Sequence, residues 1–268
     1  MFQKLVELVA LVTYGNLYLQ GRNNEFELDK LVTHNCYGRD FIDSPIDGIA
    51  GSTKVLASDT NKWFKYLSDQ GAKQLKLYYK TASHSDLPDH ISTAFVGGGS
   101  QWLIEVQFDT SSDLYLGEWY PSTDVGLDTR KTHCVRLNRD MTHLDDISES
   151  VEKSREKLSK ILQELTEFAG KFDYAQNWVN NFNNALTTLH EFEPSPSDEF
   201  LPAGIYSKEA HQLIQGAFAS WVFGGMGSWN DMVHMAMSSE GHERHTKLSE
   251  ELYLTMCNTI VSGVNSYP

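Results

Sequence analysis

The chain has 268 residues, of which 40% are hydrophobic and 12% aromatic, so it can bury a sizeable core and does not belong to the disordered class. It carries 36 acidic and 22 basic residues, which gives a net charge of −14. Nucleic acids and anionic membranes attract clustered Lys and Arg, so this charge argues against both as partners and favours a basic protein partner.

The cysteines and the N-terminal segment indicate a cytoplasmic protein. Cys36, Cys134 and Cys257 are odd in number and far apart, which is typical of a reducing compartment. The apolar start of the chain contains a single Lys, places Glu7 inside the apolar run and lacks a cleavage-site pattern, so it predicts an amphipathic helix rather than a signal peptide. No apolar run is long enough to predict a membrane span.

Short elements follow this first helix. Residues 17–19 and 54–57 predict short strands, and the segment between them is rich in turn-forming residues. Asp59 is placed to cap a helix that ends at Gly71.

After Gly71 the spacing of apolar residues changes from the helical period of three and four to the alternation of a strand. Apolar and polar residues alternate along a series of short segments that are separated by turn residues. Strands this close in sequence form an antiparallel meander with one buried face. The predicted strands span residues 75–79, 91–96, 102–108, 114–120 and 133–137.

From about residue 145 the chain is helical. Apolar residues recur at spacings of three and four, and Gly170, Asp173 and Ser207 stand at predicted helix ends. A Pro-rich acidic segment over residues 191–204 predicts a surface loop. A last helix is predicted over residues 243–264.

These patterns predict the α+β class. Residues 1–141 form an α+β subdomain with an antiparallel β-meander and flanking helices, and residues 142–268 form a helical subdomain. The pattern leaves open whether the two pack as one unit.

Residues 217–232, AFASWVFGGMGSWNDM, combine large aromatic residues, glycines and a Ser-Asn-Asp cluster. Glycines interrupt a helix, so the segment predicts a tight corner between two helices. We expect Trp221 and Trp229 to cover this corner, and Gly225 to tolerate no β-branched side chain if its φ is positive. Ser228 and Asp231 have the spacing of a capping box.

Phosphate binding at this glycine loop is the alternative, because helix N-termini present free N–H groups. The loop contains no Lys, its spacing matches neither common phosphate-binding pattern, and Asp231 would compete for the same donors. The structural interpretation is therefore favoured.

The motif WVFGGMGSWNDM, followed by LSEELYLTMCNTIVSGVNS, resembles the C-terminal end of an uncharacterised family of bacterial hypothetical proteins. The resemblance covers about the last fifty residues. It implies a bacterial origin and brings no activity and no functional residue.

The cysteines offer no clear catalytic pattern. His34, Cys36 and Asp40 lie close in sequence, and His133 precedes Cys134, but a Cys–His site also needs the two side chains to meet in space. Cys134 alternates with strand residues, so we expect it to pack in a sheet face.

Histidines suggest no metal site either. His234, His242 and His245 lack the short fixed spacings of zinc ligands, and His84 and His90 flank a proline in a loop. No GxSxG, HExxH or paired-carboxylate signature occurs. We therefore expect no metal, no cofactor and no catalytic residue recognisable from the sequence.

The function hypothesis is a soluble binding protein, of the immunity type or an inhibitory partner of another protein. The alternative is a hydrolase-like enzyme with a noncontiguous active site; oligomeric state stays open. Trp and Tyr anchor protein interfaces well. The candidate binding residues are Trp119, Tyr120, Trp221, Gly225, Ser228, Trp229 and Asp231.

Overall fold

The computed structural model divides the chain into two compact units and confirms the α+β class. The sheet unit comprises residues 3–80 and 101–146, and the helical unit comprises residues 1–2, 81–100 and 147–268. Residues 81–100 thus group with the helices that follow residue 146. The structure describes residues 2–22, 36–43, 54–81, 87–95, 98–118, 130–195, 198, 200–201, 203–234 and 238–268.

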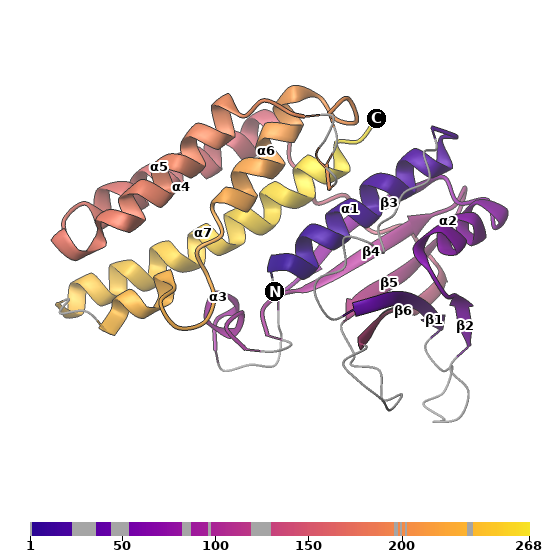
Figure 1. The fold of residues 1–268 in the computed structure, drawn as a ribbon, viewed down its shortest axis with the longest axis horizontal. Helices are drawn as coiled ribbons and strands as arrows, with labels where there is room; N and C mark the ends of the chain where they lie inside the picture. The colour runs from indigo at the N-terminus through magenta and orange to yellow at the C-terminus, as the bar shows by residue number, and fades with distance from the viewer. Residues whose placement is uncertain are drawn as a thin grey trace. The chain divides into compact units, whose positions relative to one another are not determined.

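Figure 1 labels the elements of both units. The strands are β1 (Cys36–Asp43), β2 (Val55–Ala57), β3 (Gln74–Lys80), β4 (Gln101–Gln107), β5 (Ser112–Glu118) and β6 (Arg130–Met141). The α-helices are α1 (Phe2–Leu19), α2 (Thr60–Asp69), α3 (Asp89–Ser92), α4 (Val151–Ala169), α5 (Gln176–Glu191), α6 (Lys208–Ala219) and α7 (Ser239–Asn265). The 3₁₀ helices in the described part of the chain are η2 (Asp173–Ala175) and η3 (Trp229–His234).

The sheet has six strands in the order β2-β1-β6-β5-β4-β3. Strands β3 to β6 form the predicted antiparallel meander. Strand β1 pairs with β6 in parallel, so the sheet is mixed. The meander pairs strands that follow one another in the chain: a short turn joins β4 to β5, whereas residues 81–100, which include α3, connect β3 to β4. The parallel pair joins segments far apart in the chain.

Helices α1 and α2 cover one face of this sheet (Figure 1). Asn16 of α1 hydrogen-bonds both the backbone N–H and the carbonyl oxygen of Leu75, at 2.7 and 2.9 Å. Trp63 of α2 stacks on Phe41 of β1 with ring centroids 4.2 Å apart. Both indole and phenyl rings are fully buried, so this face is the core of the sheet unit.

Several predicted elements are confirmed. Strand β2 lies within residues 54–57, and the carboxylate of Asp59 accepts a hydrogen bond from the N–H of Lys62 at the start of α2. Ser207 caps α6 by accepting from the N–H of Ala210 at 3.1 Å.

Two predicted strands are wrong. Residues 17–19 are the last residues of α1. The side chain of Asn16 hydrogen-bonds the backbone of Leu75 in β3, which holds this end of the helix on the sheet. Residues 89–92 form α3, because Pro88 precedes a helical turn in which the Thr93 hydroxyl donates back to the His90 carbonyl oxygen at 2.9 Å. A short apolar segment before glycines had favoured a strand over residues 91–96, but local side-chain bonds stabilise the helical turn.

The helical unit is built from α4, α5, α6 and α7. Helix α4 contacts α5 and α7, and α6 contacts the same two helices. Two glycines allow close approach: a Cβ at Gly216 would lie 2.8 Å from the side chain of Leu189, and one at Gly263 would lie 2.6 Å from that of Ile214. Small residues at these crossings therefore fix the spacing of α6 against its neighbours.

The glycine corner, residues 221–231, follows α6 as expected, but its geometry differs from the prediction. The Ser228 hydroxyl donates to the carbonyl oxygen of Gly224 at 3.1 Å and does not cap a helix, and the Asp231 carboxylate accepts from the N–H of Gly227. A 3₁₀ helix, not an α-helix, begins at Trp229. The positive φ belongs to Gly227, at 83°, and not to Gly225.

Gly227→Ala should lower the free energy of unfolding by about 1–2 kcal/mol, because a left-handed backbone is strained for residues with a Cβ. Gly225→Ala is the matched control and should cost little. A Cβ at either glycine meets nothing within 4 Å, so the pair differs in φ and not in space. Denaturant midpoints at unchanged slope measure both; equal midpoints for the two variants would contradict this account of the corner.

Candidate functional site

A cavity of about 490 Å³ lies in the helical unit beside the glycine corner. Its volume falls within the range of about 300–1,000 Å³ that is typical of ligand sites. Three segments that are distant in sequence form its walls: α3 and the residues after it, the glycine corner with η3, and α7. The described residues lining it are His90, Ile91, Ala94, Phe95, Gly224, Gly225, Met226, Asn230, Asp231, His245 and Thr246.

Polar bonds hold α3 in place as one wall. The side-chain amide nitrogen of Asn230 donates to the carbonyl oxygen of His90 at 2.9 Å, which ties α3 to η3. The N–H of Ser100 donates to the Tyr253 hydroxyl of α7 at 3.0 Å, and the Ser100 hydroxyl donates to Asp89 at 2.6 Å. The cavity is therefore built by specific contacts among all three segments.

Both histidines of the cavity are buried and neutral. Burial lowers the pKa of His245 to about 4, against the hydrogen bond with Trp229 that acts to raise it. Burial also lowers the pKa of His90, although the carboxylates of Glu250 and Asp89 act in the opposite direction. Both imidazole rings are therefore uncharged near neutral pH.

The rim of the cavity is apolar. Phe95, which follows α3, is 62% exposed, and Met226, which lies in the turn of the glycine corner, is 102% exposed. Large apolar side chains held in solvent beside a cavity are a feature of binding surfaces.

A second hollow of about 350 Å³ lies on the α5 side of the same corner. Trp178 and Trp221 contribute indole rings, and Asn181 and Asn184 contribute side-chain amides. Val222 and Phe223 are buried at its base. The Asn side chains offer both hydrogen-bond donors and acceptors, so the amides alone do not favour one chemical class of ligand.

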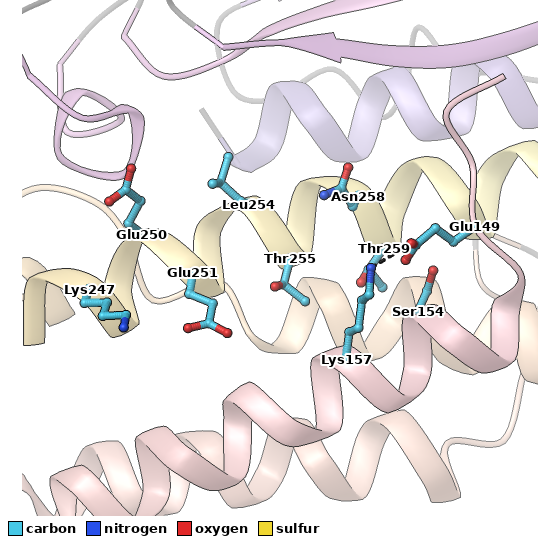
Figure 2. A pocket seen from close by; sticks show the side chains of 10 residues that line it. All are labelled: Glu149, Ser154, Lys157, Lys247, Glu250, Glu251, Leu254, Thr255, Asn258 and Thr259. Atoms are coloured by element: carbon cyan, nitrogen blue, oxygen red, sulfur yellow. Dashed lines mark hydrogen bonds and ion pairs between the residues drawn. The ribbon is translucent and has the colours of Figure 1, made fainter. Parts of the chain in front are cut away.

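A polar groove of about 310 Å³ runs between α4 and α7 (Figure 2). Lys157 of α4 reaches Glu149 at 2.6 Å, so one end of the groove is occupied by an exposed ion pair. Its remaining charges come from Lys247, Glu250 and Glu251 and are of both signs. Mixed charges without a converging set of groups make this groove the weaker candidate.

The residues predicted for binding have different positions. Trp119 and Tyr120 lie outside the described residues. Trp221 lines the second hollow, while Gly225 and Asp231 line the cavity. Trp229 is fully buried in the core, and Ser228 holds the turn.

The sequence reasoning missed the cavity residues His90, Phe95, Met226 and Asn230. The only signal for the α3 wall was the Pro-Asp pair at residues 88–89, which is compatible with a helix start. Nothing in the sequence indicated that this turn meets the glycine corner.

Cys134 is buried in the sheet face, as expected, and burial raises the pKa of its thiol. Burial likewise raises the pKa of Glu7 to about 7, against its ion pair with Arg39. Neither side chain lines any of the three hollows above. His34 and the side chain of Cys36 lie outside the described part of the chain. A buried thiol that resists ionisation is a poor nucleophile.

Ser112, His143 and Glu105 meet in the sheet unit and superficially match a hydrolase triad. The Ser112 oxygen lies 2.7 Å from the Glu105 carboxylate and 2.6 Å from Nδ1 of His143. The same carboxylate accepts the N–H of Leu144 at 2.8 Å. Ser112 and Glu105 are both 0% exposed, so no substrate reaches the hydroxyl and the cluster is structural.

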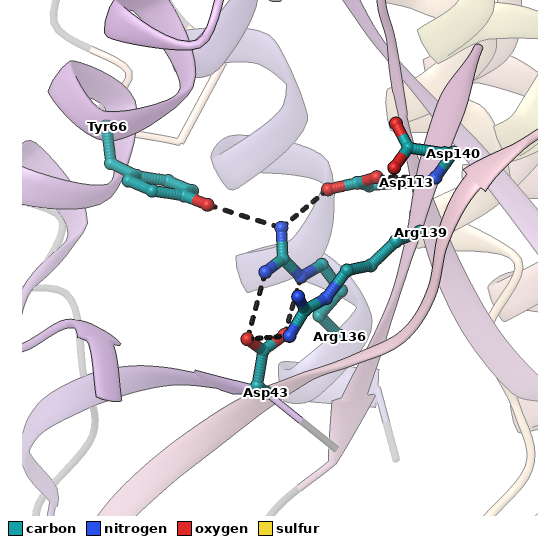
Figure 3. A network of polar contacts seen from close by, with 6 residues as sticks. All are labelled: Asp43, Tyr66, Asp113, Arg136, Arg139 and Asp140. Atoms are coloured by element: carbon teal, nitrogen blue, oxygen red, sulfur yellow. Dashed lines mark hydrogen bonds and ion pairs between the residues drawn. The ribbon is translucent and has the colours of Figure 1, made fainter. Parts of the chain in front are cut away.

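Arg136 is the centre of a second buried polar cluster in the sheet unit (Figure 3). Its guanidinium contacts Asp43 at 2.6 and 2.9 Å and Asp113 at 2.7 Å. Burial acts to raise the pKa of Asp43, but Arg136 and Arg139 hold it below its ordinary value. Asp140, with φ at 46°, is fixed by the Asp113 carboxylate. The donors and acceptors are paired with one another, so the cluster joins β1, β5 and β6.

Among the described residues, no group of three or more His, Cys, Asp or Glu side chains is arranged to hold a metal ion. His245 faces Trp229 with ring centroids 4.7 Å apart, and the side chain of His234 is not described.

No helix in the described ranges is long and apolar enough to cross a membrane. Comparison of the chain with protein-family models, curated proteins and solved structures finds no match. The resemblance of the corner motif to a bacterial family therefore stays a prediction.

His245→Gln should change how stability depends on pH. In the unfolded chain this histidine takes up a proton near pH 6.5, whereas in the folded protein it stays neutral down to about pH 4. The contribution of His245 to the free energy of unfolding is therefore fully present above pH 6.5 and is lost as the pH falls towards 4. Over that window the slope of unfolding free energy against pH should become shallower by up to about 1.4 kcal/mol per pH unit. Parallel slopes for the two proteins would show that His245 is not held neutral.

Proposed function

We propose that this protein is a binding protein whose helical unit recognises a basic protein partner at the cavity beside the glycine corner. The observation that carries the proposal is the pair of exposed apolar side chains, Phe95 and Met226, on the rim of a cavity of about 490 Å³.

The rim has the composition of an interface centre. Aromatic and Met side chains are enriched at such centres, and Lys and Glu are depleted. Phe95 and Met226 are two of the described large apolar residues that remain exposed, and both line the same cavity. Covering them with a partner would remove apolar surface from water, which favours association.

The charge of the helical unit favours a basic partner. This unit holds eighteen acidic and eight basic residues, so it carries ten of the fourteen net negative charges. Excess negative charge accelerates encounter with a positively charged surface, and added salt weakens that steering.

An inhibitory or immunity-type role is the form of binding that this arrangement favours. A protein that covers a basic surface blocks whatever that surface binds, without chemistry of its own. The enzyme alternative has less support, because Cys134 and the Ser112 hydroxyl are buried and already engaged or protonated.

The test is partner capture with the double variant Phe95→Ser, Met226→Ser. Proteins captured by the wild type should be bound at least about tenfold less well by the variant, as expected when two central interface side chains are removed. The matched control is Val55→Ser, Leu137→Ser, which removes apolar side chains that are 53% and 42% exposed in the sheet unit. Quantitative mass spectrometry of the captured proteins at low and high salt gives the readout.

Proteins lost with the cavity variant, retained by the control and having a pI above about 9 would support the proposal. Capture that responds equally to both variants, or a dependent partner that is acidic, would overturn it.

A further inference from the structure

The second hollow, on the α5 side of the glycine corner, has no charged side chain among the described residues that line it. Its volume of about 350 Å³ is within the range of ligand sites. It shares no lining residue with the cavity on the other side of the corner, so it is a separate candidate site. A ligand recognised here is one that needs no counter-charge.

The exposed face of α5 has an unusual composition for a helix. Asparagine is a poorer helix former than Glu or Lys, because its side chain competes for backbone hydrogen bonds. The exposed face of α4, by contrast, is built mainly from Glu and Lys, which keep a helix soluble without that cost. Helix stability and solubility therefore do not account for the five exposed asparagines among the sixteen residues of α5, which are Asn177, Asn180, Asn181, Asn183 and Asn184.

Two of these asparagines, Asn181 and Asn184, line the hollow. They are three residues apart, so they are neighbours on one side of α5, and Trp178 precedes them at the same spacing. Each side-chain amide offers two N–H donors and one carbonyl acceptor. Since both side chains are exposed, the wall presents two sets of uncharged donors and acceptors to a ligand.

Two indoles complete the wall and are held in place by the fold. Nε1 of Trp221 donates to the carbonyl oxygen of Phe223 at 2.8 Å, which fixes that ring. Trp178 meets the buried ring of Trp229 with ring centroids 5.7 Å apart. Trp178 and Trp221 are both half-buried, so part of each ring stays exposed. Rings that are already ordered lower the entropy cost of binding a ligand.

Exposed indoles beside uncharged amides fit a ligand that has an apolar face and hydroxyl groups around it. A pyranose sugar has this pattern, because its ring C–H bonds make one face apolar. These hydrogens carry a slight positive charge and pack on the negative face of an aromatic ring. Each sugar hydroxyl both donates and accepts, as the amide groups do. A proline-rich peptide also packs on indoles, but proline has no N–H, so the amide oxygens would stay unpaired.

We propose that this hollow binds a neutral carbohydrate. A sugar ring packs on the exposed indoles, its hydroxyls hydrogen-bond Asn181 and Asn184, and the buried Val222 lies at the base. The proposal goes beyond the proposed function and uses different side chains, so either can fail alone.

The test begins with a panel of immobilised neutral oligosaccharides, their sialylated and uronic acid-containing forms, and a proline-rich peptide. The protein should bind members of the neutral set and neither the acidic forms nor the peptide. Saturation-transfer NMR with the strongest neutral binder should then show transfer to the ring C–H protons. Sorbitol keeps the hydroxyl groups but has no ring face, and it should give no transfer.

The double variant Asn181→Ala, Asn184→Ala should weaken the strongest neutral binder at least about tenfold, which corresponds to 1.4 kcal/mol, because hydrogen bonds to the ligand are lost. Asn180→Ala, Asn183→Ala is the matched control, since these exposed asparagines of the same helix do not line the hollow. The control should bind as the wild type does. Both variants should unfold at a higher denaturant midpoint, because alanine is the better helix former. A loss of binding in the first variant is then not a loss of fold.

Failure to bind any neutral oligosaccharide, preference for the acidic forms or the peptide, transfer to sorbitol equal to that of the sugar, or equal loss in both double variants would overturn the inference. None of these results bears on the proposed function, which is tested at Phe95 and Met226.

Discussion

The indole of Trp229 is the contact on which the helical unit depends. It is fully buried, and its ring meets Phe182 at 5.1 Å and Trp178 at 5.7 Å on α5, and His245 at 4.7 Å on α7. Its N–H donates to the Ser249 hydroxyl at 2.8 Å. A buried aromatic side chain of this size contributes a large share of apolar burial, and the indole N–H is paired as burial requires. One side chain thus anchors the corner to two helices.

Backbone and side-chain hydrogen bonds of Trp229 and Asn230 also tie the corner to α7 and α3. The carbonyl oxygen of Trp229 fixes the proton of His245 on Nε2, and the next residue, Asn230, uses its amide nitrogen to hold α3. A change that loosens η3 would therefore alter the shape of the cavity, because Asn230 and Asp231 line it.

The sequence pattern predicted helix caps and individual strands, and it missed the contacts between segments that are distant in the chain. The caps at Asp59 and Ser207 depend on residues within one turn, and the strands of the meander each show their own alternation and follow one another in the chain, so periodicity and end signals were sufficient. The parallel pairing of β1 with β6, and the inward position of Arg136, depend on partners distant in the chain. The cavity was missed for the same reason, since residues near 90, 225 and 245 meet only in the folded unit. A corner at these glycines was predicted, but the pattern could not show which glycine has the positive φ.

The most direct test of this account is the free energy of unfolding of Trp229→Ala, compared with Trp178→Ala, a half-buried neighbour in the same aromatic cluster. Loss of the fully buried indole should cost roughly 3–5 kcal/mol at an unchanged denaturant slope, and the half-buried one clearly less. Such a loss would confirm that Trp229 holds the corner in place. If Trp229→Ala unfolded at the wild-type midpoint, the corner would not depend on this side chain, and the account of how the cavity is built would be wrong.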